Sequence, residues 1–88
     1  MRGVRRHVKY SDGLDMRVGD LVAIGSNAKG IVVACIDTGE YSVEHPREQW
    51  GYLGIGVMID TSFGGLVHYP DQAGVFSEDI TLIARKSV

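Results

Sequence analysis

No apolar stretch in this chain is longer than a short β-strand. The longest is the six-residue run Ile31–Ile36, and turn-forming residues, many of them glycine, separate the others. Glycine adopts the backbone conformations that tight turns and bulges need, and the 88 residues include twelve glycines. This pattern predicts a mainly β fold made of many short strands.

Five segments are strand-like in composition, and one has the features of a short helix. The predicted strands lie within residues 16–24, 30–37, 56–60, 65–69 and 80–84. A helical insert is predicted at about residues 46–53, because Pro46 suits the first helical position and Gly54 suits a helix end. Residues 71–74 are predicted to form a loop. Short antiparallel strands with glycine-rich turns indicate a small barrel.

One domain is predicted, because 88 residues leave no room for a second. It covers residues 16–88, and residues 1–15, which lack periodicity, are expected to form a flexible basic leader. The inner face of the barrel is predicted to contain Val22, Ile24, Ile31, Val33, Val57, Ile59, Leu66 and Ile83.

Two short motifs resemble the opening of SH3-like barrels of the KOW and Tudor kinds. They are Val18–Val22 (VGDLV) and Lys29–Val33 (KGIVV), and Ile80–Ile83 is similar to the short strand that closes such barrels. The resemblance covers about residues 16–85 and implies a five-stranded SH3-like antiparallel barrel. The resemblance supports an inference about the fold more strongly than one about the function. Small barrels of this kind also occur as uncharacterised cargo of bacterial mobile elements.

One enzyme family with this barrel, the small plasmid-type dihydrofolate reductase, is similar in two segments, Tyr41–Glu44 and Tyr69–Pro70. Its catalytic Gln-Ile-Tyr run corresponds to Val-His-Tyr at Val67–Tyr69, so only the tyrosine carries over, and the helical insert is foreign to that family. A small-molecule-binding or catalytic barrel is therefore one alternative. The residues that it would use are Asp60, His68 and Tyr69.

Other catalytic and metal chemistry is poorly represented. Cys35 is the only cysteine and lies in the most apolar strand, where a thiol is expected to be inert. The three histidines, His7, His45 and His68, lack the spacing of metal ligands. We assign no catalytic residue, metal or cofactor, and favour a non-enzymatic role.

The charges are unevenly distributed. The first nine residues carry +4, and the remaining five basic and eleven acidic residues give −6. The basic residues are Arg2, Arg5, Arg6 and Lys9. Weak nucleic-acid binding by this arm is a second alternative, and a solvated terminus that folds back on an acidic body is favoured over it. No apolar signal segment or membrane span of about 20 residues is present, so we expect a cytoplasmic protein.

The hairpin predicted from residues 56–69 and the helical insert carry the candidate binding residues. If Val57 and Ile59 point inward, Met58 and Asp60 point outward. If Leu66 also points inward, Val67 and Tyr69 join Met58 in an exposed apolar stripe, which usually marks an interface. The aromatic residues are expected either to fill the end of the barrel or to line a groove. The candidates are Trp50, Tyr52, Met58, Asp60, Phe63, Val67, His68 and Tyr69.

The favoured function is therefore a non-enzymatic module that binds a protein partner or itself, with a homodimer as one form. A chain of 88 residues buries only about 60–65% of its unfolded surface. The apolar side chains that this small barrel leaves uncovered are expected to meet another molecule.

Overall fold

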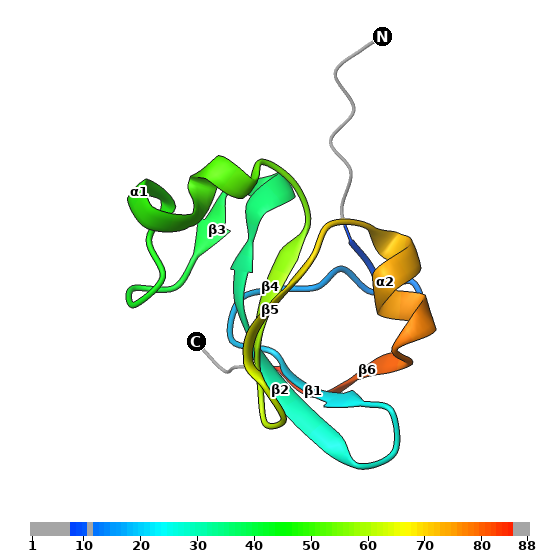
Figure 1. Cartoon of the computed structure of the whole chain (residues 1–88). Coiled ribbons are helices and arrows are strands. Elements are labelled where there is room, and N and C mark those ends of the chain that lie inside the picture. Colours follow the sequence, from blue (N-terminus) through cyan, green and yellow to red (C-terminus); the bar gives the residue numbers. More distant parts are fainter. Residues whose placement is uncertain (1–7, 11, 86–88) are drawn as a thin grey trace, which may run out of the picture.

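The protein is mainly β, as the sequence predicts, and forms one antiparallel sheet (Figure 1). The computed structural model describes residues 8–10 and 12–85. The strands are β1 (Leu21–Ile24), β2 (Ala28–Cys35), β3 (Glu40–Tyr41), β4 (Val57–Thr61), β5 (Gly65–Tyr69) and β6 (Ile80–Ala84). Their order in the sheet is β5-β4-β2-β1-β6, and the short β3 pairs with β2.

The helices are short and lie between strands. They are η1 (Ile36–Thr38), α1 (Arg47–Trp50), η2 (Gly51–Leu53) and α2 (Gln72–Ser77). The pair α1 and η2 confirms the helical insert predicted at about 46–53. The loop predicted at 71–74 is wrong, because α2 begins there: the Asp71 side chain caps the helix by accepting a hydrogen bond from the Gly74 N–H, 3.2 Å away.

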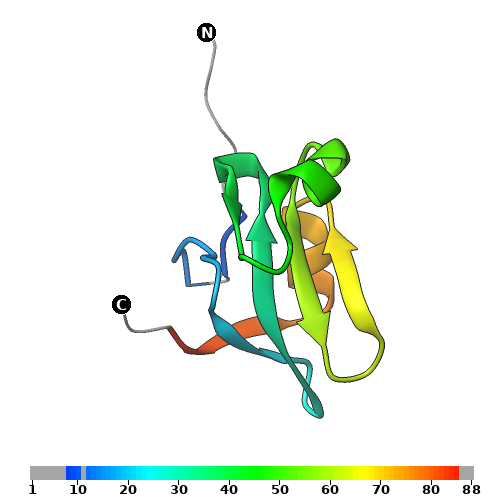
Figure 2. The same ribbon diagram turned by 90° about the vertical axis from the view of Figure 1, so that its left-hand side faces the viewer.

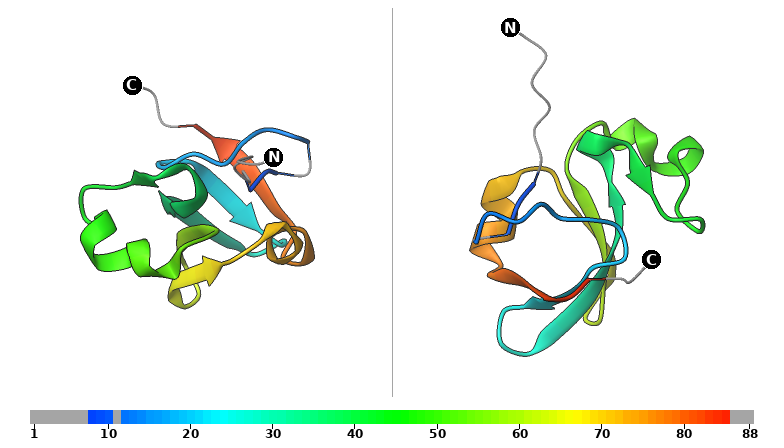
Figure 3. Two further views of the ribbon diagram at one scale, coloured as in Figure 1. Left: turned by 90° about the horizontal axis from the view of Figure 1, so that it is seen from above. Right: turned by 180° about the vertical axis from the view of Figure 1, so that it is seen from behind.

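The main core lies on the concave side of the sheet. Figure 3 shows the sheet curving, with α2 and the segment before β1 across its open side. The inward positions predicted for Val22, Ile24, Val57 and Ile59 are confirmed. The buried members of this core are Val8, Tyr10, Met16, Val22, Ile24, Val32, Cys35, Val57, Ile59, Tyr69, Val75 and Ile80.

The packed part of the chain includes residues that precede the predicted domain start at Met16. Val8 and Tyr10 are 6% and 2% exposed and lie in the main core. Lys9 and Asp15 form an isolated antiparallel bridge that folds this segment back on itself. The flexible leader predicted for residues 1–15 is thus corrected for 8–10 and 12–15, and residues 1–7 lie outside the described part.

A second, smaller core lies on the opposite face of the sheet. It contains Val33, Ala34, Ile36 and Met58, with Tyr41, Trp50 and Leu53 packed against them. The pairing of β2 with β4 shifts between Val32 and Ala34, which is a bulge. Figure 2 shows the insert lying over β2 and β4 at this place.

This second core corrects two predictions. Val33 is buried, but under the insert and not inside the main core. Met58 does point away from Val57 and Ile59, yet it is only 2% exposed because the insert covers it. Burial of a methionine side chain stabilises a fold by about 1.5–3 kcal/mol, so Met58 fixes the insert to the sheet and is no free interface residue.

β5 faces the other way from the prediction, whereas β4 faces as predicted. Asp60 pairs with Leu66 and Ile59 pairs with Val67, and directly opposed residues share a face of the sheet. Leu66 therefore points outward and is 38% exposed. The predicted inward positions of Leu66, Ile31 and Ile83 are wrong, since the latter two are 41% and 48% exposed.

A buried carboxylate joins the two ends of the described chain. Asp20 is fully buried and accepts hydrogen bonds from the Tyr10 hydroxyl at 2.6 Å and the Arg17 N–H at 2.9 Å. The Arg85 guanidinium donates two more at 3.1 Å each. We call these four residues the Asp20 clasp. Burial and the neighbouring Asp20 raise the pKa of Tyr10 above its usual range, so its hydroxyl stays a donor.

Candidate interaction surface

A row of side chains crosses the outer face of the sheet. Leu21 pairs with Ile31, Ile31 with Asp60, and Asp60 with Leu66. Directly opposed residues project on the same side, so these four side chains, which we call the outer row, are neighbours. Ile31 and Leu66 are 41% and 38% exposed, and Asp60 is exposed between them. The row is thus mainly apolar and carries one carboxylate.

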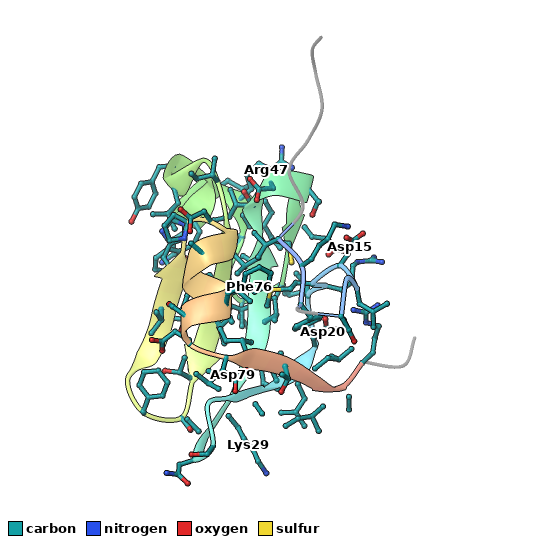
Figure 4. The ribbon with its side chains drawn as sticks, turned by 90° about the vertical axis from the view of Figure 1, so that its right-hand side faces the viewer. Asp15, Asp20, Lys29, Arg47, Phe76 and Asp79 are labelled. Atoms are coloured by element: carbon teal, nitrogen blue, oxygen red, sulfur yellow. The ribbon has the colours of Figure 1, made fainter. Side chains whose placement is uncertain are left out.

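A shallow hollow of about 300 Å³ lies in this face. Its lining includes Lys29, Ile31 and Asp60, together with Ser62. Two hydrogen bonds hold the backbone here, from the Lys29 N–H to the Ser62 hydroxyl (3.1 Å) and from the Ser62 N–H to the Lys29 carbonyl (2.9 Å). The Lys29 side chain projects away from the body of the protein (Figure 4). Hence a cation and an anion stand on one surface beside an apolar side chain.

Other exposed apolar residues lie at the ends of the neighbouring elements. Phe63, at the tip of the β4–β5 hairpin, is 57% exposed, and Tyr52, on η2, is 78% exposed. Ile55, just after η2, is 54% exposed. Of the predicted binding candidates, Tyr52, Asp60 and Phe63 are therefore accessible to a partner.

The predicted aromatic candidates do not gather in one groove. Trp50 packs against the second core on the outer face of the sheet, away from the main core. Tyr69 lies in the main core. Among the described residues, the aromatic contact observed is between His45 and Trp50, with centroids 6.4 Å apart. A cage of several rings is absent from this part of the chain: Trp50 and Tyr69 pack in different cores, and Tyr52 and Phe63 are exposed.

His68 and Tyr69 lie on opposite faces of β5. Tyr69 is 6% exposed and packs in the main core. Val67, on the same face of β5, is partly buried and packs against that core. Burial raises the Tyr69 pKa. His68 Nε2 lies 2.7 Å from the Ile55 carbonyl oxygen, so this nitrogen donates and fastens the insert to β5. Tyr69 therefore cannot act on the same bound molecule as Asp60 and His68.

A second hollow, of about 310 Å³, lies between η1 and the insert. Arg47 lines it and is already engaged: its guanidinium carbon lies 5.4 Å from the centre of the Tyr41 ring, and its Nη2 donates to the Gly39 carbonyl at 3.3 Å. These contacts hold the insert against β3. The Arg47 side chain in this hollow therefore has a structural role.

Cys35 is buried, as predicted from the apolar sequence around it. It is 3% exposed, and its thiol donates to the Met16 carbonyl at 3.3 Å. Burial, helped by the charges of Glu40 and Asp20, raises the pKa of Cys35 to about 12. The thiolate, which is the reactive form, is therefore scarce at neutral pH.

We expect this thiol to react with a disulfide reagent at pH 8 at least about a hundredfold more slowly in the folded protein than in denaturant. The measurement is the release of thionitrobenzoate, and the denatured chain is its own control because it has no other cysteine. Equal rates with and without denaturant would contradict the buried position.

The basic arm is mostly outside the described residues, which exclude Arg2, Arg5 and Arg6. Lys9 forms an ion pair with Asp15, at 2.5 Å. Within the described residues, no group of three histidine, cysteine, aspartate or glutamate side chains is arranged to hold a metal ion. No helix in this part of the chain is both long and apolar enough to cross a membrane.

Comparison of the chain with protein-family models, with curated proteins and with solved structures gives no match. The outer row and its hollow form an accessible surface with apolar, cationic and anionic side chains. The sequence missed Lys29, Ile31 and Leu66 as members of it. The signal that would have revealed them is the register of β2, β4 and β5, which brings residues 31, 60 and 66 together.

Proposed function

We propose that the protein is a non-enzymatic, cytoplasmic interaction module built on an SH3-like barrel. Two features support this barrel: β6 pairs with the opening strand β1, and α2 with the segment before β1 packs across the concave side. The module binds a protein chain, either a different one or a second copy. The surface that does so is the outer row, and Phe63, at the tip of the β4–β5 hairpin, is a further exposed apolar residue.

The observation that carries this proposal is the exposure of Ile31 and Leu66 in one row. Isolated exposed apolar residues are ordinary. Here two of them share one face of the sheet, on either side of Asp60, and exposed apolar side chains gathered on one face are typical of a binding surface. The side chains best suited to chemistry point elsewhere: Cys35 and Tyr69 are buried in the main core. A surface with apolar contact area and no convergent reactive groups fits binding better than catalysis.

The test is partner capture with the immobilised full chain. Ile31→Ser and Leu66→Ser are expected to lose the proteins that the original chain recovers, because each removes exposed apolar contact area without opening the core. Leu14→Ser is the matched control, since Leu14 is also an exposed leucine (48%) but lies before β1, away from the row. Recovery of the same proteins by all three variants would overturn the proposed surface.

A further inference from the structure

We propose that the outer row binds a second copy of this chain, in a face-to-face dimer with two-fold symmetry. In this dimer, Lys29 of each copy pairs with Asp60 of the other, and the two Ile31 side chains meet between these pairs. The inference rests on the proposed function and names the partner of the same surface.

The first argument is the balance of charge on this surface. Lys29 and Asp60 are both exposed and both line the hollow beside Ile31. Neither forms an ion pair within the described part of the chain, where the observed pairs are Lys9–Asp15, Arg17–Glu40 and Arg85–Asp20. A partner of one charge sign would meet a like charge here. A second copy instead presents the opposite charge at each position.

The second argument is the symmetry that such an interface needs. In a two-fold interface the same patch is used by both subunits, so the patch must be complementary to itself. A patch in which an apolar residue has a cation as one neighbour and an anion as another meets that condition. A patch of only apolar residues would allow many registers, whereas the two charges select one.

The positions of these residues on the sheet agree with that symmetry. Lys29 and Ile31 lie two residues apart on β2, about 6.6 Å along the strand, and Asp60 lies about 4.8 Å to the side of Ile31. A two-fold axis parallel to the sheet, perpendicular to the line from Lys29 to Asp60 at its midpoint, exchanges the two positions. The same operation brings Ile31 within about 3 Å of its own image, measured along the sheet plane.

The distance between the copies also suits these side chains. Facing sheets pack about 10 Å apart, a gap that an extended lysine and an aspartate span together. Because the apolar contact area is small, we expect a dissociation constant in the micromolar range, about 1–100 μM. The ion pairs lie at the rim of the contact, so added salt is expected to weaken the dimer.

The test is sedimentation equilibrium on four full-length proteins: the original chain, Lys29→Glu, Asp60→Lys, and the double variant. Each single variant places two like-charge contacts in the dimer, so its dissociation constant is expected to rise about tenfold or more. The double variant restores both pairs with reversed sign, so its dissociation constant is expected to return close to the original. Glu48→Lys, which makes the same charge change as Asp60→Lys on exposed α1, is expected to change nothing.

Two results would overturn the inference. One is a monomeric original chain at all concentrations up to about 1 mM, well above the expected dissociation constant. The other is a dimer that the single variants weaken and the double variant does not restore. Neither result touches the proposed function, which fails only if the capture experiment gives the same proteins for Ile31→Ser, Leu66→Ser and the Leu14→Ser control.

Discussion

Replacing Gly56 with alanine is expected to destabilise the protein by about 3 kcal/mol or more. Gly56 has a φ of +89°, and a Cβ there would lie 2.2 Å from the Tyr69 carbonyl oxygen and 2.6 Å from the Pro70 Cα. These are backbone atoms, so rotation of a side chain cannot relieve the contact. The Gly56 carbonyl also accepts the Ile36 N–H at 2.8 Å, which ties the entrance of β4 to the end of β2.

Two other glycines separate the causes of this effect. Gly54 has a φ of +78°, but a Cβ added there would meet open space, so Gly54→Ala is expected to cost about 1 kcal/mol from backbone strain alone. Gly64 has neither constraint, and Gly64→Ala is expected to stay within about 0.5 kcal/mol. Urea unfolding followed by far-ultraviolet circular dichroism measures all three. A Gly56→Ala protein as stable as Gly54→Ala would show that β5 moves aside readily.

Replacing Asp20 with asparagine is expected to destabilise the protein by about 2–4 kcal/mol. The buried carboxylate accepts hydrogen bonds from Tyr10, Arg17 and Arg85. An amide keeps one oxygen and turns an NH₂ group toward donors, so at least one buried donor loses its partner. A domain of this size has a total stability of only about 4–13 kcal/mol, so this change removes a large part of it.

Asp12→Asn is the matched control for the Asp20 variant. Asp12 is exposed, and the hydrogen bond it makes within the described residues comes from the Leu14 N–H, at 3.1 Å, which an asparagine oxygen accepts equally well. Tyr10→Phe removes one donor of the clasp and leaves the carboxylate, so an intermediate loss of about 1 kcal/mol is expected. Denaturant titrations followed by the fluorescence of the single tryptophan, Trp50, give these values. Equal stability of the Asp20→Asn and Asp12→Asn proteins would contradict the role of the clasp.

The positions of five strands could be predicted because short β-rich runs end at strong turn residues, whereas the two-residue β3 was missed. The bounds predicted for β5 and β6 agree with the structure: Pro70 directly follows β5, and Asp79 directly precedes β6. Which face of each strand points toward the core was harder to predict. Leu66 and Val67 are both apolar, so either can point inward on composition alone. The turn decides: the Thr61 hydroxyl donates to the Gly65 carbonyl at 2.7 Å and accepts the Gly64 N–H at 3.2 Å.

The elements that the sequence missed bury few residues each. Among the described side chains of α2, only Val75 lies in the main core. A helix of six residues is also too short to show a helical period in its sequence. Likewise, Val8 and Tyr10 are two anchors in an otherwise polar segment. Local pattern identifies an element from repeated apolar spacing, so a segment held by one or two contacts gives no such signal.

The candidate surface was only partly predictable for a related reason. The outward direction of Met58 was correct, but its exposure depended on where the insert packs, and that contact joins residues far apart in the chain. Asp60 was identified correctly as exposed, whereas its neighbours Ile31 and Leu66 were assigned to the core. Hydrophobicity alone cannot distinguish the two sides of a sheet when both carry apolar residues, and here each side has its own core.

The Asp20 clasp has a mechanical consequence. It holds Tyr10, ahead of β1, and Arg85, after β6, on one carboxylate, and the adjoining residues Leu21 and Ala84 are paired neighbours. A stretching force applied to the two ends of the domain would therefore act first on Val8, the Lys9–Asp15 bridge and the clasp, and would then peel β6 from β1 one pair at a time. Such a domain yields at low force when pulled by its ends, even though the strands at its centre are the best buried.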